Sequence, residues 1–546
     1  MEFLRDFLGA LLRRDQAETT IELIKDRVRV TNENGRLGAN GALLLVTVIL
    51  MVIACWRRRQ AFLVFQVRGI NGPRPNFLIG NLQETKDGMS DAIRDWSKKF
   101  GKTYGFFEGP LPMLATSDIE ILKQVFITQH SKFAARKPLP VGEGPDGEDI
   151  HIAFAHGQRW KKQRDIMSPL FRTSNLKQML PEVQKCNDKF MKVLEDRRLE
   201  SKPFDIYREF QSCTLETICR VGFGLDCDGM DFEAFRRLCR DCFQSITPEG
   251  LKKRPVFLMS IILGVIFPSL KEYWNKMQMA FHNNKIDTNP SIILQEAIKG
   301  MIEERKREAS LRGDFLQQLL DASDYNNNKF KGKKSLEAGE LYANSSVFLL
   351  AGYDTTSTTL AFAAHALAIH PEMQRKIQEE IDEIVGDEAT FTYEQLKELK
   401  YLDRVISEVL RLHPVAPSGV TRMCIEETTV KGIHFPRGLS VVADVRTLHS
   451  DPELWGNNPE EFDPDRFLPE KKASRNSAAY LPFGIGPRHC IGMRFALVEM
   501  KLILVTLLRK YTLSRCEETV VPMDVCESAT LLIPKEGVMV KVELRD

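Results

Sequence analysis

The sequence predicts a mainly α-helical protein with a small β portion, an α+β fold preceded by one N-terminal transmembrane helix. Long charged stretches repeat their apolar residues with the helical period, whereas strand-like runs are few and short. The helical stretches are residues 175–200, 291–311, 340–369 and 371–385, and the clearest strand-like runs are 111–116 and 440–445. A run of 20 residues without a charge, Leu37 to Trp56, is long enough to cross a bilayer.

The transmembrane helix is expected over residues 37–56 because three consecutive arginines, 57–59, follow it directly. Arginines beside a tryptophan are typical of a lipid interface. Residues 1–36 form an N-terminal extension whose apolar spacing indicates an amphipathic helix on the membrane. Residues 57–76 form a basic, proline-containing hinge, since proline holds the chain extended. The globular body is expected over residues 77–546.

The composition excludes several classes of protein. With 43% hydrophobic and 27% charged residues, the chain is neither disordered nor fibrous. The 76 Lys and Arg residues are balanced by 74 Asp and Glu residues, which argues against a nucleic-acid partner. Eleven cysteines are too few for a disulfide scaffold and indicate a reducing compartment.

A second apolar run, Pro255 to Leu270, contains 16 uncharged residues bounded by prolines. It is short for a membrane span, and three interpretations remain open: a buried core segment, a loop or short helix that dips into the membrane surface, and a second full crossing. The polar stretch from Asp324 to Lys334 is typical of a surface loop between helices.

The chemistry is expected near Cys490. The segment 483–492 places three glycines, a proline and this cysteine directly before a helical pattern. Such a loop brings backbone N–H groups close to the sulfur, and the following helix N-terminus adds positive dipole. Both effects favour the thiolate form of the cysteine.

The pattern Phe483-x-x-Gly486-x-Arg488-x-Cys490-x-Gly492 resembles the haem-binding signature of the cytochrome P-450 haem-thiolate monooxygenases. The resemblance implies the cytochrome P-450 fold, with 77–546 as the catalytic domain. It also implies haem b (iron protoporphyrin IX) as cofactor, with the Cys490 thiolate as the proximal ligand of its iron. Arg488 would pair with a haem propionate, and Phe483 would pack near the sulfur.

Two further motifs resemble a structural network of that family. Glu408 and Arg411 form its Glu-x-x-Arg pair, and i and i+3 lie on one helix face. Arg466 follows in a segment whose arginine completes the network, although Asp465 stands where glutamate is common. We expect these three residues to serve folding and haem retention; a surface ion pair is the alternative.

The segment 351–356 resembles the oxygen-activating part of the family's long central helix. Ala351 and Gly352 are small enough to let a flat cofactor and O₂ approach, although glycine is unfavourable inside a helix. The resemblance makes Thr355 the hydrogen-bond donor to iron-bound oxygen and Asp354 the residue that relays protons. Close helix packing is the alternative for this segment alone.

Trp160 and Arg164 resemble the pair that a family helix supplies to a haem propionate, and Arg422 lies where related sequences place another propionate contact. Arg159 and Lys162 would then point to the other side of the helix. They are candidate contacts for an acidic reductase surface, or simply a solvated helix face.

The resemblance is greatest to the microsomal animal branch that oxidises drugs and steroids. It implies an apolar pocket for a small lipophilic substrate: a xenobiotic, a steroid or a fatty-acid-like molecule. The residues expected to line it include Phe348, Val415, Ala416 and Leu531. Besides O₂, the implied partners are NADPH-cytochrome P-450 reductase, with cytochrome b5 as a second donor. The implied location is the endoplasmic reticulum membrane, single-pass, with the catalytic domain facing the cytosol.

Two functions other than a monooxygenase are compatible with the same haem loop. Some relatives with the same haem loop are isomerases that rearrange peroxides without O₂, and a non-catalytic haem carrier would not need Thr355.

Cys239 and Cys242 have zinc-ligand spacing, but no second pair follows them. Asn344 begins a formal glycosylation sequon, yet it lies on the expected core helix.

Overall fold

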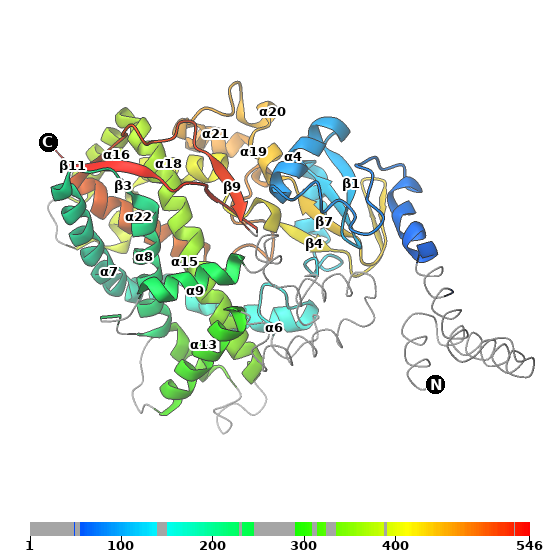
Figure 1. The fold of residues 1–546 in the computed structure, drawn as a ribbon, viewed down its shortest axis with the longest axis horizontal. Helices are drawn as coiled ribbons and strands as arrows, with labels where there is room; N and C mark the ends of the chain where they lie inside the picture. The colour runs from blue at the N-terminus through cyan, green and yellow to red at the C-terminus, as the bar shows by residue number, and fades with distance from the viewer. Residues whose placement is uncertain are drawn as a thin grey trace, which may run out of the picture.

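The computed structural model describes residues 49, 55–138, 150–225, 227–228, 232–244, 290–307, 314–323, 335–386, 390–528 and 530–545. Helices predominate, and small sheets lie beside them, so the expected α-rich fold with a small β portion is confirmed. Figure 1 shows the helix-rich part at one end of the molecule and the sheet that contains β1, β4 and β7 toward the other, beside the first described helical residues.

The α-helices of the described residues are α4 Met89–Phe100, α5 Ile119–Lys123, α6 Gly157–Met167, α7 Thr173–Glu200, α8 Ile206–Thr217, α9 Phe232–Gln244, α13 Pro290–Arg307, α14 Phe315–Asp321, α15 Ala338–Ile369, α16 Pro371–Ile384, α17 Tyr393–Glu398, α18 Lys400–Leu412, α19 Val445–His449, α20 Pro452–Trp455, α21 Pro469–Ser474 and α22 Met493–Lys510. Short 3₁₀ segments are η2 Ser168–Phe171, η6 Pro417–Gly419, η7 Pro464–Phe467 and η8 Ser477–Ala479, and π-helical segments are η1 Gln124–Thr128 and η3 Ile218–Gly222. The four predicted helical stretches lie in α7, α13, α15 and α16.

The strands are β1 Thr103–Glu108, β2 Leu111–Thr116, β3 Phe204–Asp205, β4 Thr421–Met423, β5 Thr428–Val430, β6 Ile433–Phe435, β7 Ser440–Ala443, β8 Tyr511–Ser514, β9 Val525–Ser528, β10 Leu531–Pro534 and β11 Met539–Leu544. The largest sheet has the order β1-β2-β7-β4, with β2 and β7 parallel and the outer pairs antiparallel. The predicted strand 440–445 ends two residues early because the Asp444 carboxylate caps α19 by accepting from the Thr447 N–H.

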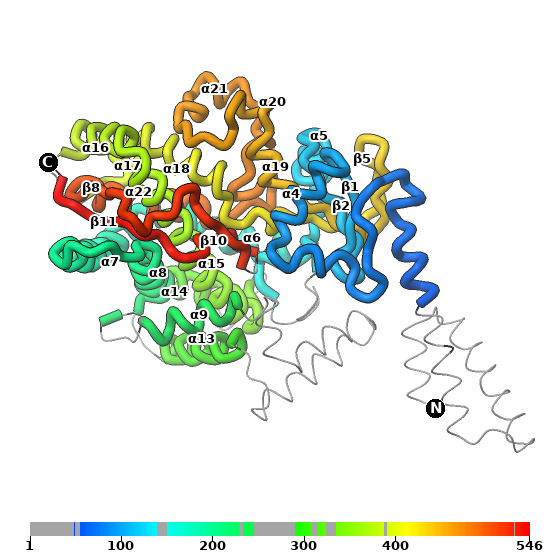
Figure 2. The backbone as a smooth tube through the Cα atoms, turned by 45° about the horizontal axis from the view of Figure 1, so that its top comes forward, coloured from blue at the N-terminus to red at the C-terminus, as the bar shows by residue number. Residues whose placement is uncertain are grey.

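Helix α15 is the central element of the helical part. Its 32 residues begin at a capping box between Glu337 and Glu340 and end just before Pro371, which cannot continue a helix. It packs against α8, α13, α18 and α22, and Figure 2 shows its course among them. At Gly352 the neighbouring segment comes so close that an added Cβ would lie 2.9 Å from the Ile218 side chain.

The membrane-related predictions fall mostly outside the described residues. These are the extension 1–36, nearly all of the span 37–56 and the apolar run Pro255–Leu270; the loop 324–334 lies outside as well. Among the described helices, none has the length and apolar character that a bilayer crossing requires. The predicted hinge 57–76 is helical as far as residue 66, where Phe65 is buried against Phe107.

Candidate active site

A cavity of about 410 Å³ lies between α15 and the loop that carries Cys490. Phe483, Arg488 and Cys490 line it from the loop, and α15 contributes Phe348, Ala351, Gly352 and Thr355. The structure therefore brings together two segments that are more than a hundred residues apart in the chain. The sequence had linked them only through the family resemblance.

The Cys490 loop needs its glycines. Gly484 and Gly486 have φ values of +71° and +75°, a region that favours glycine. A Cβ on Gly486 would lie 1.9 Å from the Phe126 carbonyl oxygen, so no other residue fits there. The Cys490 N–H donates to the Phe483 oxygen at 2.8 Å, and α22 begins three residues after the cysteine. This geometry fixes where the sulfur can lie.

Burial raises the pKa of the Cys490 thiol, and the backbone N–H groups of Gly492 and Met493 and the guanidinium groups of Arg164 and Arg136 oppose that rise. The loop and helix effects expected to favour the thiolate are therefore present. Together they lower the pKa of Cys490 by less than the desolvation of the sulfur raises it. The sequence did not reveal this desolvation.

Four arginines, residues 136, 164, 422 and 488, line one edge of the cavity. Among the described residues, their hydrogen bonds to protein oxygens go to backbone carbonyls, for example from Arg164 Nη1 to the His489 oxygen at 2.9 Å. Within the described ranges, none of the four forms an ion pair with a carboxylate. Burial lowers the pKa of each, to about 9 for Arg488, which Arg136 also repels.

This edge fits the expected haem. Arg136 Nε and Arg488 Nη1 are buried and have no hydrogen-bond partner in the part of the chain that the structure describes, and a buried cation without a counter-charge is costly. The Arg488 guanidinium stacks 4.8 Å from the Trp160 ring, which also lines the cavity. The two propionates of haem would supply the missing acceptors and negative charge, and the mainly apolar walls suit its ring.

Arg136 was missed by the sequence reasoning. It belongs to no motif, and it reaches the cavity because Ala135 forms an isolated β-bridge with Met423, next to Arg422. Only that long-range pairing places the two arginines together, and no local sequence signal marks it.

The α15 residues expected at the reaction site divide into two groups. Thr355 lines the cavity, and its hydroxyl donates to the Ala351 oxygen at 2.7 Å. Asp354 is not among the lining residues: its Oδ1 accepts hydrogen bonds from Tyr207 and Gln211 of α8. Burial raises the pKa of Asp354, and those two hydrogen bonds oppose the rise.

The expected substrate-pocket residues are also divided. Phe348, Val415 and Ala416 line the cavity, whereas Leu531 is buried in the main hydrophobic core and its neighbour Thr530 lines the cavity instead. Phe348 packs edge-on against Phe315 with 4.3 Å between ring centroids, and Phe171 contacts both rings. Three aromatic rings thus form one wall.

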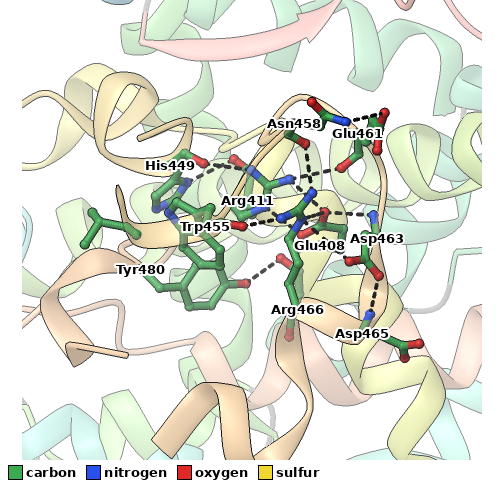
Figure 3. Close-up of polar contacts among 12 residues, drawn as sticks. Glu408, Arg411, His449, Trp455, Asn458, Glu461, Asp463, Asp465, Arg466 and Tyr480 are labelled. Carbon is green, nitrogen blue, oxygen red and sulfur yellow. Dashed lines mark hydrogen bonds and ion pairs between the residues drawn. The ribbon is translucent and has the colours of Figure 1, made fainter. Parts of the chain in front are cut away.

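Glu408, Arg411 and Arg466 form a closed network, shown in Figure 3. Both oxygens of the fully buried Glu408 accept from Arg411 at 2.7 Å, and Arg466 Nε lies 3.4 Å from Glu408 Oε1. Arg411 also donates to the His449 oxygen, and Arg466 to the Trp455 and Asn458 oxygens. The network lies outside the cavity lining, and Asp465 pairs with Arg404 at the surface.

Helix α6 presents Trp160 and Arg164 to the cavity. Arg159 Nε and Lys162 Nζ instead contact the buried Glu340 of α15 at 2.7 and 2.9 Å. Both cations therefore have an internal partner that the sequence did not reveal, and because their side chains stay partly exposed, the expected reductase contact stays a prediction.

The weaker sequence signals have structural explanations. Cys239 and Cys242 are buried in the apolar core around α9, and no group of three metal-ligating side chains occurs in the described part of the chain. Asn344 is fully buried, where it donates to the Glu340 oxygen and accepts from the Ile152 N–H. A glycan could not be accommodated there.

Comparison with known proteins agrees with this site. The family model for Cytochrome P450 matches residues 70–542. Cytochrome P450 3A11 of Mus musculus is 33% identical over 515 residues, which cover 92% of this chain and 96% of that protein. Cytochrome P450 3A5 of Homo sapiens is 34% identical over 508 residues, with the same two coverages. The chain therefore belongs to the cytochrome P450 family, as a haem-thiolate monooxygenase that inserts one atom of O₂ into a lipophilic substrate with electrons from an NADPH-dependent reductase.

Proposed function

We propose that Cys490 is the axial ligand of the haem iron and that Arg136, Arg164, Arg422 and Arg488 hold the haem propionates. The observation that carries this assignment is the convergence on one cavity of Cys490, whose side chain is exposed to the cavity, and four arginines that have no carboxylate partner among the described residues. When bound, haem supplies the iron that activates O₂ and that keeps its cysteine ligand deprotonated.

The walls of the cavity orient the reactants and exclude water. Ala351 and Gly352 leave space beside α15, and Phe483 packs on the thiolate side of the cavity. Thr355 could turn its hydroxyl away from the Ala351 carbonyl and hold that proton at the cavity wall beside Gly352. Asp354, one residue earlier, supplies protons to that side of the helix.

The substrate is proposed to be a lipophilic xenobiotic, steroid or fatty-acid-like molecule. The wall of Phe171, Phe315 and Phe348, together with Val415 and Ala416, offers apolar area and aromatic faces. Such a surface selects for apolar bulk rather than for a particular polar group.

The sequence supports a single-pass anchor over 37–56. From the family resemblance we infer that this anchor lies in the endoplasmic reticulum membrane and that the catalytic domain faces the cytosol, where the electron donor lies. In that position the domain meets NADPH-cytochrome P-450 reductase, and cytochrome b5 serves as a second electron donor.

The carbon monoxide difference spectrum of the reduced protein tests the ligand assignment. A thiolate-ligated ferrous complex has a strongly red-shifted Soret band, which we expect from the wild type and from the control Cys516→Ala. Cys490→Ala should lose the shift. A red-shifted band in Cys490→Ala would refute the assignment.

A further inference from the structure

The carboxyl group of Asp354 is held by helix α8 rather than by the cavity. Tyr207 Oη lies 3.1 Å from Asp354 Oδ1, and Gln211 Nε2 donates to the same oxygen at 3.2 Å. Tyr207 Oη also lies 3.0 Å from Thr358 Oγ1, one helical turn further along α15. Tyr207 and Thr358 are buried, so this chain of three polar groups is enclosed between the two helices.

The tyrosine can serve both protonation states of the carboxyl, because a phenol hydroxyl both donates and accepts. With Asp354 ionised, Thr358 donates to Tyr207 and Tyr207 donates to Asp354. With Asp354 neutral, both hydrogen bonds reverse, and the proton of the carboxyl is donated to Tyr207. A lysine or arginine at this position could only donate and would hold the carboxyl ionised.

We infer that Tyr207 is a positioning residue for proton delivery, which keeps the Asp354 carboxyl hydrogen-bonded whether it is ionised or neutral. The carboxyl can then release its proton toward the Thr355 side of α15 and recover one from water without leaving a buried group unsatisfied. This inference rests on the proposed roles of Asp354 and Thr355.

The charges around the carboxyl are compatible with such an exchange. The titratable groups that face Asp354 are Tyr207 from α8, Tyr353 from its own helix and Cys239 from α9. Burial raises the pKa of all three, so each is neutral near pH 7 and Tyr207 keeps its own proton while its hydroxyl turns.

The test compares Tyr207→Phe with Thr214→Val in the full-length haem protein, with reductase and with testosterone as the lipophilic probe. Thr214 is a matched control, since its hydroxyl donates at 3.0 Å to the Tyr353 oxygen across the same helix pair. In Tyr207→Phe we expect the peroxide released per NADPH consumed to rise about threefold to tenfold, with a changed solvent isotope effect and an unchanged KM. Thr214→Val should leave all three unchanged.

Infrared spectroscopy supplies a readout that does not depend on turnover. The carboxylic acid C=O band of Asp354 is the band that disappears in Asp354→Asn, and Tyr207→Phe should shift it to higher frequency through the loss of its hydrogen bond. In the Asp354→Asn background, Tyr207→Phe should add no further peroxide.

The possible outcomes distinguish failure of the role of Tyr207 from failure of the role of Asp354. If Asp354→Asn raises peroxide release but Tyr207→Phe does not, or if Thr214→Val matches Tyr207→Phe, the positioning role of Tyr207 is overturned. If Asp354→Asn itself leaves peroxide release unchanged, the proposed role of Asp354 falls, and the inference falls with it.

Discussion

Two buried clusters of arginines in this protein differ in whether a carboxylate pairs with them. The network around Glu408 contains a fully buried carboxylate that accepts from Arg411 and lies close to Arg466, whereas the cavity edge of Arg136, Arg164, Arg422 and Arg488 has no paired carboxylate in the described residues. A buried charge that is paired internally belongs to the fold. A buried charge left without a partner indicates a ligand, and that difference separates structural arginines from cofactor-binding ones.

The largest effect is expected from breaking the paired cluster. Glu408→Gln leaves Arg411 buried without a counter-charge and Arg466 with only Asp463, 4.0 Å away, and breaking a buried pair typically costs about 3–5 kcal/mol of stability. Chemical denaturation of the purified protein measures the loss. The control Asp465→Asn removes only the partly exposed pair with Arg404 and should cost less than about 1 kcal/mol. Equal losses in the two variants would contradict the comparison.

The unpaired cluster should respond with the opposite sign. Arg136→Gln or Arg488→Gln removes a repelled, buried charge, so the haem-free protein should be as stable as the wild type or more so. Haem should dissociate about 10- to 100-fold faster, because a hydrogen bond to a charged group contributes about 1.5–3 kcal/mol. Thermal unfolding of the haem-free form and haem transfer to apomyoglobin measure the two effects. Destabilised haem-free protein would place these arginines with the structural cluster.

A smaller effect is expected in the pH dependence of the unfolding free energy, through a histidine of the Glu408 network. His449 joins the Glu408 network as a neutral ring: Nδ1 contacts the Arg411 oxygen, and Nε2 accepts from the Leu481 N–H. Burial lowers its pKa to about 3. The unfolded chain binds a proton near pH 6.5, so this stability is full above that pH and is lost as the pH falls toward 3.

The loss at pH 5 is about 2 kcal/mol for a shift of this size. We expect His449→Phe to show a shallower decline in unfolding free energy between pH 7 and pH 5 than the wild type. The surface variant His130→Gln should keep the wild-type decline. An unchanged slope in His449→Phe would mean that other groups cause the acid sensitivity.

The parts predicted from sequence were those whose residues lie close together in the chain. The Cys490 loop and the Glu408–Arg411 pair are local patterns, and local backbone geometry brings their atoms together. Whether Asp354 and Leu531 reach the cavity depends on the direction in which each side chain points. Adjacent helix positions point about 100° apart, which separates Asp354 from Thr355. Thr530 lies just before β10, which begins at Leu531, and it lines the cavity whereas Leu531 packs in the core.

Other partners could not be predicted because they are distant in sequence. Tyr207 lies 147 residues from Asp354, and Arg159 lies 181 residues from Glu340. Charged side chains on a predicted helix look solvated until the tertiary fold shows what faces them. The same limit applied to Arg136, whose position depends on pairing between distant strands.

The ion pairs from α6 to Glu340 also have a mechanical consequence. They join the helix that carries Trp160 and Arg164 to the beginning of α15, so two walls of the cavity are tied together at a buried carboxylate. Separating them would expose a buried carboxylate. Further along α15, Gly352 meets Ile218 of η3 in an apolar contact that contains no ion pair. We therefore expect the contact between α15 and α6 to resist separation more strongly than the contact between α15 and η3.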